Sequence, residues 1–177
     1  FRLAAAGLVA TSRQTSWRPG CGLECLSMHA SHHAVAGSAR RQFEIPVRVY
    51  YEDTDAGGVV YYANYLRFLE RARTEWLRHI GFEQQKIIDE QHLVFVVKRI
   101  EADYHAPGRL DDELRVEVAV DRLGNASLVF AQRVFRDMQV LLDARVTVVC
   151  VDIRRMKPAP IPAPMRAKLE ETMKAAA

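Results

Sequence analysis

Apolar and polar residues alternate along several stretches of the chain, and this two-residue period is typical of strands with one buried face. The alternation is clearest in 112–123, where Leu or Val at 114, 116, 118 and 120 are separated by polar or small residues. The same kind of pattern predicts strands over 43–51, 93–105, 112–123, 126–137 and 140–153. The last four follow one another without a long helix between them, which favours an antiparallel meander.

A helical period of three to four residues begins at Asn64 and predicts one long helix. Asn64 is a residue type that often caps the start of a helix, and Gly81 is the glycine that commonly follows a helix end. The apolar positions between them are 65, 66, 69, 72, 76, 77 and 80. Because these positions form a wide stripe, we expect a sheet to wrap around this helix. A short second helix is predicted over 83–91.

Turn signals agree with an antiparallel sheet. Gly124-Asn125 is typical of a hairpin between the third and fourth predicted strands, and the sequence RDMQ (136–139) suits a tight turn before the last strand. Prolines at 158, 160, 162 and 164 mark an extended connection, and 165–176 is predicted to be a terminal helix. The pattern alone therefore predicts an α+β fold with one long helix on an antiparallel sheet.

The first 42 residues differ in composition from the rest and are treated as a leader. They are rich in Ala, Ser, Gly and Arg and contain a single acid, Glu24. Three interpretations remain open: a signal peptide containing LAAAGLVA, a transit peptide, or upstream translation with the native start at Met28. We expect disorder through about residue 41 and a folded domain over 43–177.

Charge and cysteine content restrict the function classes. The net charge is +3, but the leader holds five Arg and one acid, which leaves 20 basic and 21 acidic residues in the domain. A nucleic-acid partner is therefore not expected. Cys21, Cys25 and Cys150 do not form a disulfide framework, and this indicates a reducing, cytoplasmic environment. No apolar run approaches the ~20 residues of a membrane-spanning helix.

The stretch YYEDTDAGGVVYYANY (50–65) carries the candidate chemistry. Three carboxylates, Glu52, Asp53 and Asp55, precede a glycine pair and the predicted helix start. The first turn of a helix has free N–H groups and a partial positive charge, which suit an oxyanion developing on an acyl carbonyl. A carboxylate a few residues earlier could attack that carbonyl or activate a water. The alternative is that these acids only cap a turn.

The longer string VRVYYEDTDAGGVVYYANYLRFLERARTEWLR resembles the Tol-Pal-associated acyl-CoA thioesterases of the 4-hydroxybenzoyl-CoA thioesterase family. The resemblance extends over about 43–160 and includes YHAPGRLDDEL and KPAPIP. It implies a hotdog fold, in which a curved antiparallel sheet wraps a long central helix. It also implies hydrolysis of acyl-CoA to free acid and CoA, without a cofactor or metal.

The resemblance also assigns roles within the motif. Asp55 corresponds to the nucleophile or general base, and the backbone N–H of Tyr62 to the group that polarises the thioester carbonyl. Many members of the Tol-Pal subgroup have His at position 62, but a backbone donor does not depend on the side chain. Gly58 and Val59 are expected to border the bound thioester. Asp53 is expected to bind loop N–H groups, and Glu52 to face away because side chains alternate along a strand.

The phosphates of CoA require cations, and Lys98, Arg99 and Arg155 are the candidates. Each could equally be an ordinary solvated charge.

A homodimer or homotetramer is expected, since the edge strand of a curled sheet needs a partner. Acyl carrier protein is a further candidate partner. A non-catalytic hotdog module that binds acyl-CoA or acyl carrier protein is the competing function; a hotdog dehydratase is disfavoured because no His lies between Phe43 and Trp76.

Overall fold

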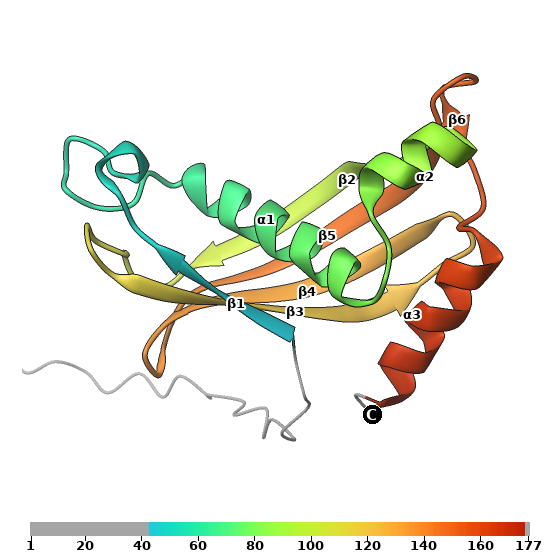
Figure 1. Ribbon diagram of the computed structural model, residues 1–177. Coiled ribbons are helices and arrows are strands. Elements are labelled where there is room, and N and C mark those ends of the chain that lie inside the picture. Colours follow the sequence, from blue (N-terminus) through green and yellow to red (C-terminus); the bar gives the residue numbers. More distant parts are fainter. Residues whose placement is uncertain (1–42, 176–177) are drawn as a thin grey trace, which may run out of the picture. The chain divides into compact units, whose positions relative to one another are not determined.

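The computed structural model describes residues 43–175, which form an antiparallel sheet with a long helix across one face (Figure 1). The strands are β1 (Phe43–Arg48), β2 (Leu93–Tyr104), β3 (Glu113–Leu123), β4 (Ser127–Arg136), β5 (Gln139–Asp152) and β6 (Lys157–Pro158). Their order in the sheet is β1-β3-β4-β5-β2, with β6 paired to β5. The predicted strand positions are confirmed. The predicted four-strand meander holds only for β3, β4 and β5, because β2 pairs with β5 at the edge of the sheet and does not lie beside β3. The expectations for the leader lie outside the described residues.

The helices are α1 (Asn64–His79), α2 (Gln84–Gln91) and α3 (Ala163–Ala175). The apolar stripe of α1 is buried against the sheet, as its period predicted, and Trp76 meets Phe130 edge to face with ring centroids 5.4 Å apart. The terminal helix begins two residues earlier than predicted, since proline at position 164 is well tolerated in a first helical turn. None of the helices among residues 43–175 is long and apolar enough to cross a membrane.

The two ends of α1 differ in how well the sequence predicted them. Gly81 has φ 97°, its N–H donates to Arg78 O (2.9 Å), and Phe82 N–H donates to Leu77 O (3.0 Å). This is the Schellman arrangement expected of a glycine after a helix. The prediction that Asn64 caps the start is wrong, because Ala63 occupies the cap position and makes no side-chain cap.

The predicted first strand was also too long. It ends at Arg48, and Tyr51–Asp53 form a single 3₁₀ turn, η1. Glu52 was predicted to face away from Asp53 because side chains alternate along a strand, and this reason is wrong since no strand extends to Glu52. Glu52 is nevertheless exposed and Asp53 is buried.

Strand β2 forms one edge of the main sheet and exposes apolar side chains. Val96 is 48% exposed, Val97 41% and Ile100 38%. A bulge between Val97 and Arg99 leaves Lys98 out of the pairing with β5. A long, partly apolar edge of this kind is a surface to which another strand can be added.

Candidate active site

The acid–glycine motif folds into a tight loop between η1 and α1. An antiparallel bridge joins Thr54 to Val60, and inside it Asp55 N–H donates to Val59 O (2.9 Å). Gly58 N–H returns a hydrogen bond to Asp55 O (3.0 Å), and Gly58 has φ 73°, which favours glycine. The glycine therefore permits the reversal that sets Asp55 at the start of the loop.

Asp55 is exposed, and only part of its carboxylate is used by the loop. Its Oδ1 accepts a hydrogen bond from Gly57 N–H (2.7 Å), and a Cβ at Gly57 would lie 3.0 Å from this oxygen. No described residue donates to the other oxygen, Oδ2. The pKa of Tyr61 is raised, chiefly by its hydrogen-bonding interaction with Tyr62 and to a smaller extent by the negative charge of Asp55. The carboxylate thus lies within electrostatic range of Tyr61.

Asp53 has a structural position, as expected. It is 7% exposed, and its Oδ2 accepts a hydrogen bond from Tyr50 N–H (2.9 Å). Its carbonyl oxygen accepts two more, from Tyr61 N–H (2.8 Å) and from Asn64 Nδ2 (3.0 Å). Asp53 therefore joins η1 to the start of α1.

Free N–H groups stand at the start of α1. Tyr61 C=O accepts a hydrogen bond from Asn64 N–H (2.8 Å), and Tyr62 C=O accepts one from the Tyr104 hydroxyl (3.0 Å). No acceptor for the N–H groups of Tyr62 and Ala63 is found among residues 43–175. With the positive end of the α1 dipole behind them, these groups can bind an anionic oxygen. A carboxylate and free N–H groups on one loop are suited to acyl transfer.

A second loop, residues 105–112, supports the first. Val60 N–H donates to Gly108 O (2.9 Å), and Gly108 N–H donates to the hydroxyl of buried Tyr65 (2.8 Å). A Cβ at Gly108 would lie 3.1 Å from Val60 Cγ2 and 3.2 Å from the Tyr65 hydroxyl oxygen. Glycine is therefore needed for this close approach. The stretch YHAPGRLDDEL (104–114) is part of the family resemblance, but no role was predicted for Gly108.

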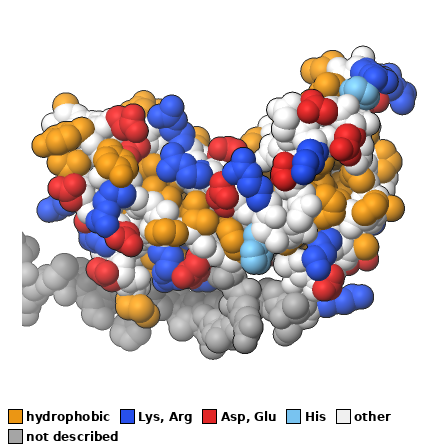
Figure 2. Space-filling model, in the orientation of Figure 1, with side chains coloured by type: hydrophobic (Ala, Val, Ile, Leu, Met, Phe, Trp, Pro, Cys, Tyr) orange, Lys and Arg blue, Asp and Glu red, His pale blue; other side chains and the backbone are white. Residues whose placement is uncertain are grey.

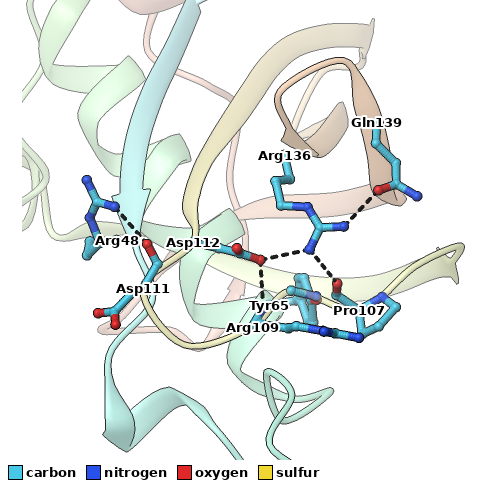
Figure 3. Close-up of polar contacts among 9 residues, drawn as sticks. Arg48, Tyr65, Pro107, Arg109, Asp111, Asp112, Arg136 and Gln139 are labelled. Carbon is cyan, nitrogen blue, oxygen red and sulfur yellow. Dashed lines mark hydrogen bonds and ion pairs between the residues drawn. The ribbon is translucent and has the colours of Figure 1, made fainter.

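The second loop is itself fixed by charge (Figure 3). Asp112 Oδ2 lies 3.0 Å from Arg136 Nη1 and accepts a hydrogen bond from Arg109 N–H (2.8 Å). Arg136 also donates to Pro107 O (3.4 Å) and to Gln139 Oε1 (2.8 Å). The loop is thereby joined to β4 and β5.

The predicted cations lie outside this cluster. Lys98 and Arg99 are exposed on β2 at the bulge, and Arg99 pairs with Glu101 (2.7 Å). Arg155 lies in the turn after β5, where its N–H donates to Asp152 Oδ1 (3.3 Å). The structure thus brings Asp55, Gly58, Val59 and Tyr62 together but not the three cations.

Strand β2 separates Arg155 from the acid loop within one chain. The Tyr104 end of β2 contacts Tyr62, and the opposite end at Leu93 pairs with Asp152 beside the Arg155 turn. A strand of 12 residues spans roughly 35 Å at about 3.3 Å per residue. Arg155 therefore cannot reach a phosphate on a thioester bound at Asp55 of the same chain, unless the ligand extends along the whole strand.

An apolar cavity of about 90 Å³ lies between α1, α3 and the sheet. Its lining includes Trp76, Leu77, Phe95, Val97, Phe130 and Met165. The lining also includes the polar residues Glu70, Arg73, Thr74 and Gln84. Arg73 Nη1 donates to Gln132 Oε1 (2.7 Å), and burial lowers the pKa of Arg73. Because Phe95 and Val97 belong to β2, the cavity reaches the edge of the sheet.

Comparisons with known proteins decide the family. The family model of the thioesterase-like superfamily matches residues 49–169. The chain belongs to this superfamily. This thioesterase is 52% identical over 125 residues to the acyl-CoA thioesterase YbgC of Haemophilus influenzae, which covers 71% of the chain and 92% of the relative. It is 32% identical over 135 residues to the long-chain acyl-CoA thioesterase FadM of Escherichia coli, which covers 75% and 99%.

Solved structures agree with this placement. A probable thioesterase from Bartonella henselae superposes with a TM-score of 0.66 at 32% identity, covering 68% of this chain and 99% of the other. A 1,4-dihydroxy-2-naphthoyl-CoA thioesterase from Synechocystis gives 0.69 at 25% identity, covering 73% and 96%. The expected α+β hotdog fold and the expected thioesterase are confirmed. The relatives named as acyl-CoA thioesterases support thioester hydrolysis as the activity.

Proposed function

We propose that this thioesterase hydrolyses acyl-CoA thioesters to the free acid and CoA, with Asp55 as the reacting carboxylate. The observation that carries the proposal is the exposed Asp55 carboxylate on the same loop as the free N–H groups of Tyr62 and Ala63. The relatives named acyl-CoA thioesterases support the substrate class.

In the proposed reaction, the thioester carbonyl oxygen accepts hydrogen bonds at the start of α1, where the N–H of Tyr62 is free. Asp55 takes a proton from a water as the water oxygen bonds to the carbonyl carbon. The C–S bond then breaks, and the thiolate of CoA leaves and takes up a proton. In the nucleophilic alternative Asp55 forms a mixed anhydride, which water then hydrolyses. Gly58 and Val59 border the approach to the carbonyl, and Gly58 adds no side chain that would obstruct it.

We further propose that two copies pair through their β2 edges. An antiparallel pair related by a two-fold axis places the Tyr104 end of one β2 beside the Leu93 end of the other. Each Asp55 loop then lies near the Arg155 turn and the apolar cavity of the other copy. In this arrangement Arg155 of the other copy can contact the CoA phosphates, which Arg155 of the same chain cannot reach. The cavity of the other copy can bind the acyl group. Lys98 and Arg99, in the middle of β2, would lie along the path of the CoA.

The test of the reaction is thiol release from a panel of short, long and aromatic acyl-CoAs, comparing wild type with Asp55→Asn. We expect kcat to fall by about 10²–10⁴-fold, as for loss of a general base or nucleophile, with an unchanged melting temperature. Asp137→Asn is the matched control: Asp137 is exposed in the β4–β5 turn, and its φ of 53° suits Asn equally well.

Two results would contradict the proposal in different ways. Near-normal turnover by Asp55→Asn would remove Asp55 from the reaction while leaving the thioesterase activity in place. Binding of acyl-CoA by the wild type without any thiol release would instead indicate the non-catalytic acyl-CoA-binding module.

A further inference from the structure

The two free N–H groups at the start of α1 belong to peptide units that are held in different ways. The Tyr61–Tyr62 peptide is fixed by the main chain, because Asn64 N–H donates to its carbonyl (2.8 Å). The Tyr62–Ala63 peptide is fixed by a side chain, because its carbonyl accepts the Tyr104 hydroxyl (3.0 Å). No other donor to Tyr62 O is found among the described residues.

A hydrogen bond to this carbonyl determines where the adjacent N–H points. The peptide unit is planar and trans, so its C=O and N–H bonds are directed to opposite sides. Holding Tyr62 C=O against Tyr104 therefore aims the Ala63 N–H away from β2. Without the hydroxyl, the unit could rotate within the first turn, where no regular helical hydrogen bond restrains it.

The position of Tyr104 is determined by its surroundings. Its ring meets Tyr65 edge to face, with centroids 5.7 Å apart, and Tyr65 is 2% exposed. The Tyr65 hydroxyl is used by Gly108 N–H (2.8 Å), so Tyr65 is fixed in turn by the second loop. Tyr104 is 48% exposed, and partial desolvation raises the pKa of its hydroxyl above the ordinary value of 10.0, which already lies well above neutral pH. The hydroxyl is therefore a protonated donor at neutral pH. A rigid path thus runs from the second loop to the first turn of α1.

We propose that Tyr104 is a positioning residue for thioester hydrolysis: its hydroxyl orients the Tyr62–Ala63 peptide so that Ala63 N–H donates to the oxyanion beside Tyr62 N–H. This inference rests on the proposed function. No hydrogen bond joins Tyr104 to Asp55 among the described residues, and the proposed role of Tyr104 is exerted through the Tyr62–Ala63 peptide. Strand β2 thereby supplies a hydroxyl group that orients an oxyanion donor.

The test compares Tyr104→Phe with wild type in thiol release. Removing one oxyanion donor outright costs about 10²–10³ in kcat, and here the donor remains but loses its orientation, so we expect a fall of about tenfold. KM should change by less than about twofold, since the donor matters most when negative charge develops. The melting temperature should stay the same, because Phe keeps the ring contact with Tyr65. The matched control is Tyr51→Phe, since the Tyr51 side chain is 82% exposed and no hydrogen bond of its hydroxyl is found among the described residues.

A spectroscopic measurement separates orientation from a general structural effect. The probe is an S-(2-oxoalkyl)-CoA, a ketone that cannot be hydrolysed, labelled with ¹³C at the carbonyl. We expect its carbonyl stretch to shift to lower wavenumber on binding to wild type, and to move back toward the value in water in Tyr104→Phe. The position of the stretch does not depend on how much protein is active.

The outcomes are distinguishable. A wild-type kcat in Tyr104→Phe, or a reduced kcat with an unchanged carbonyl stretch, would overturn the role of Tyr104. A wild type that binds the ketone but releases no thiol from any acyl-CoA would refute the proposed function. In that case the carbonyl stretch still decides whether Tyr104 orients the peptide.

Discussion

Asn64 offers a sharp test of how the acid loop is attached to α1. Its side chain does not cap the helix; Nδ2 donates to Asp53 O (3.0 Å) and, more weakly, to Glu52 O (3.4 Å). Asn64 is 9% exposed, so water replaces these contacts poorly. The informative changes are Asn64→Ala, which removes the donor, and Asn64→Asp, which keeps the shape but replaces the donor with a charged acceptor.

The expected cost of Asn64→Ala follows from what its partners retain. Asp53 O still accepts Tyr61 N–H (2.8 Å), so no strongly buried acceptor is left without a partner. The loss is then one net hydrogen bond and some packing, about 1–1.5 kcal/mol. For a domain of this size that lowers the melting temperature by roughly 3–7 °C. Because the Asp55 loop loses one attachment to the helix, we also expect kcat to fall by about tenfold.

Asn64→Asp should cost more, about 3 kcal/mol, because a buried carboxylate would face two carbonyl oxygens and the nearby Asp53. The loss should diminish at acid pH, where the protonated side chain can donate again. The assays are thermal unfolding by circular dichroism at several pH values and thiol release. Asn125→Asp is the control, since the Asn125 side chain bonds to no described residue. Asp is as good a helix cap as Asn, so a stable, fully active Asn64→Asp would show that capping is the true role of Asn64.

Two further predictions concern the thiol and the sheet edge. Burial raises the pKa of the Cys150 thiol above its ordinary value of 9.0. In a Cys21→Ser/Cys25→Ser background, iodoacetamide at pH 8 should therefore label the native protein far more slowly than the urea-unfolded protein. Equal labelling rates would contradict this prediction. Because the folded-state pKa is the higher one, the contribution of Cys150 to the free energy of unfolding is fully present below the unfolded-state pKa. This contribution is lost as the pH rises from the unfolded-state pKa through the folded-state pKa. Ile100→Lys should raise the dissociation constant of the proposed β2-paired dimer by about tenfold or more in sedimentation equilibrium. Met138→Lys is the control and should leave the dissociation constant unchanged, since Met138 is 90% exposed in the β4–β5 turn. A dimer unchanged by Ile100→Lys would argue against pairing through this edge.

Features that depend on residues close together in the chain were predicted, and features that depend on contacts between distant residues were missed. The strands, α1 and the end at Gly81 were predicted because periodicity and C-terminal glycine are local signals. The 3₁₀ turn at Tyr51–Asp53 was missed because aromatic residues, which are common in strands, continue to Tyr51. Its decisive contact is an Asp53 side chain folded back onto Tyr50 N–H. The cap assignment for Asn64 failed for a related reason. Residue type correctly indicated a polar role at the helix start, but the partners lie 11 and 12 residues earlier.

The parts of the candidate site that the sequence could not show are those made across the fold. Tyr104 lies 42 residues from Tyr62, and Gly108 lies 43 residues from Tyr65. No spacing in the chain announces either contact. The loop that carries Asp55 is specified locally by its glycines, whereas the Tyr62–Ala63 peptide is held by Tyr104 on β2. Under the proposed mechanism, substitutions in the local motif should therefore remove the reacting group, and substitutions in the distant supports should leave it in place but misdirect the proposed oxyanion donors. Thiol-release assays on variants of both kinds would test this: variants of the distant supports should lose kcat although the Asp55 carboxylate is still present, whereas variants of the motif lose the carboxylate itself.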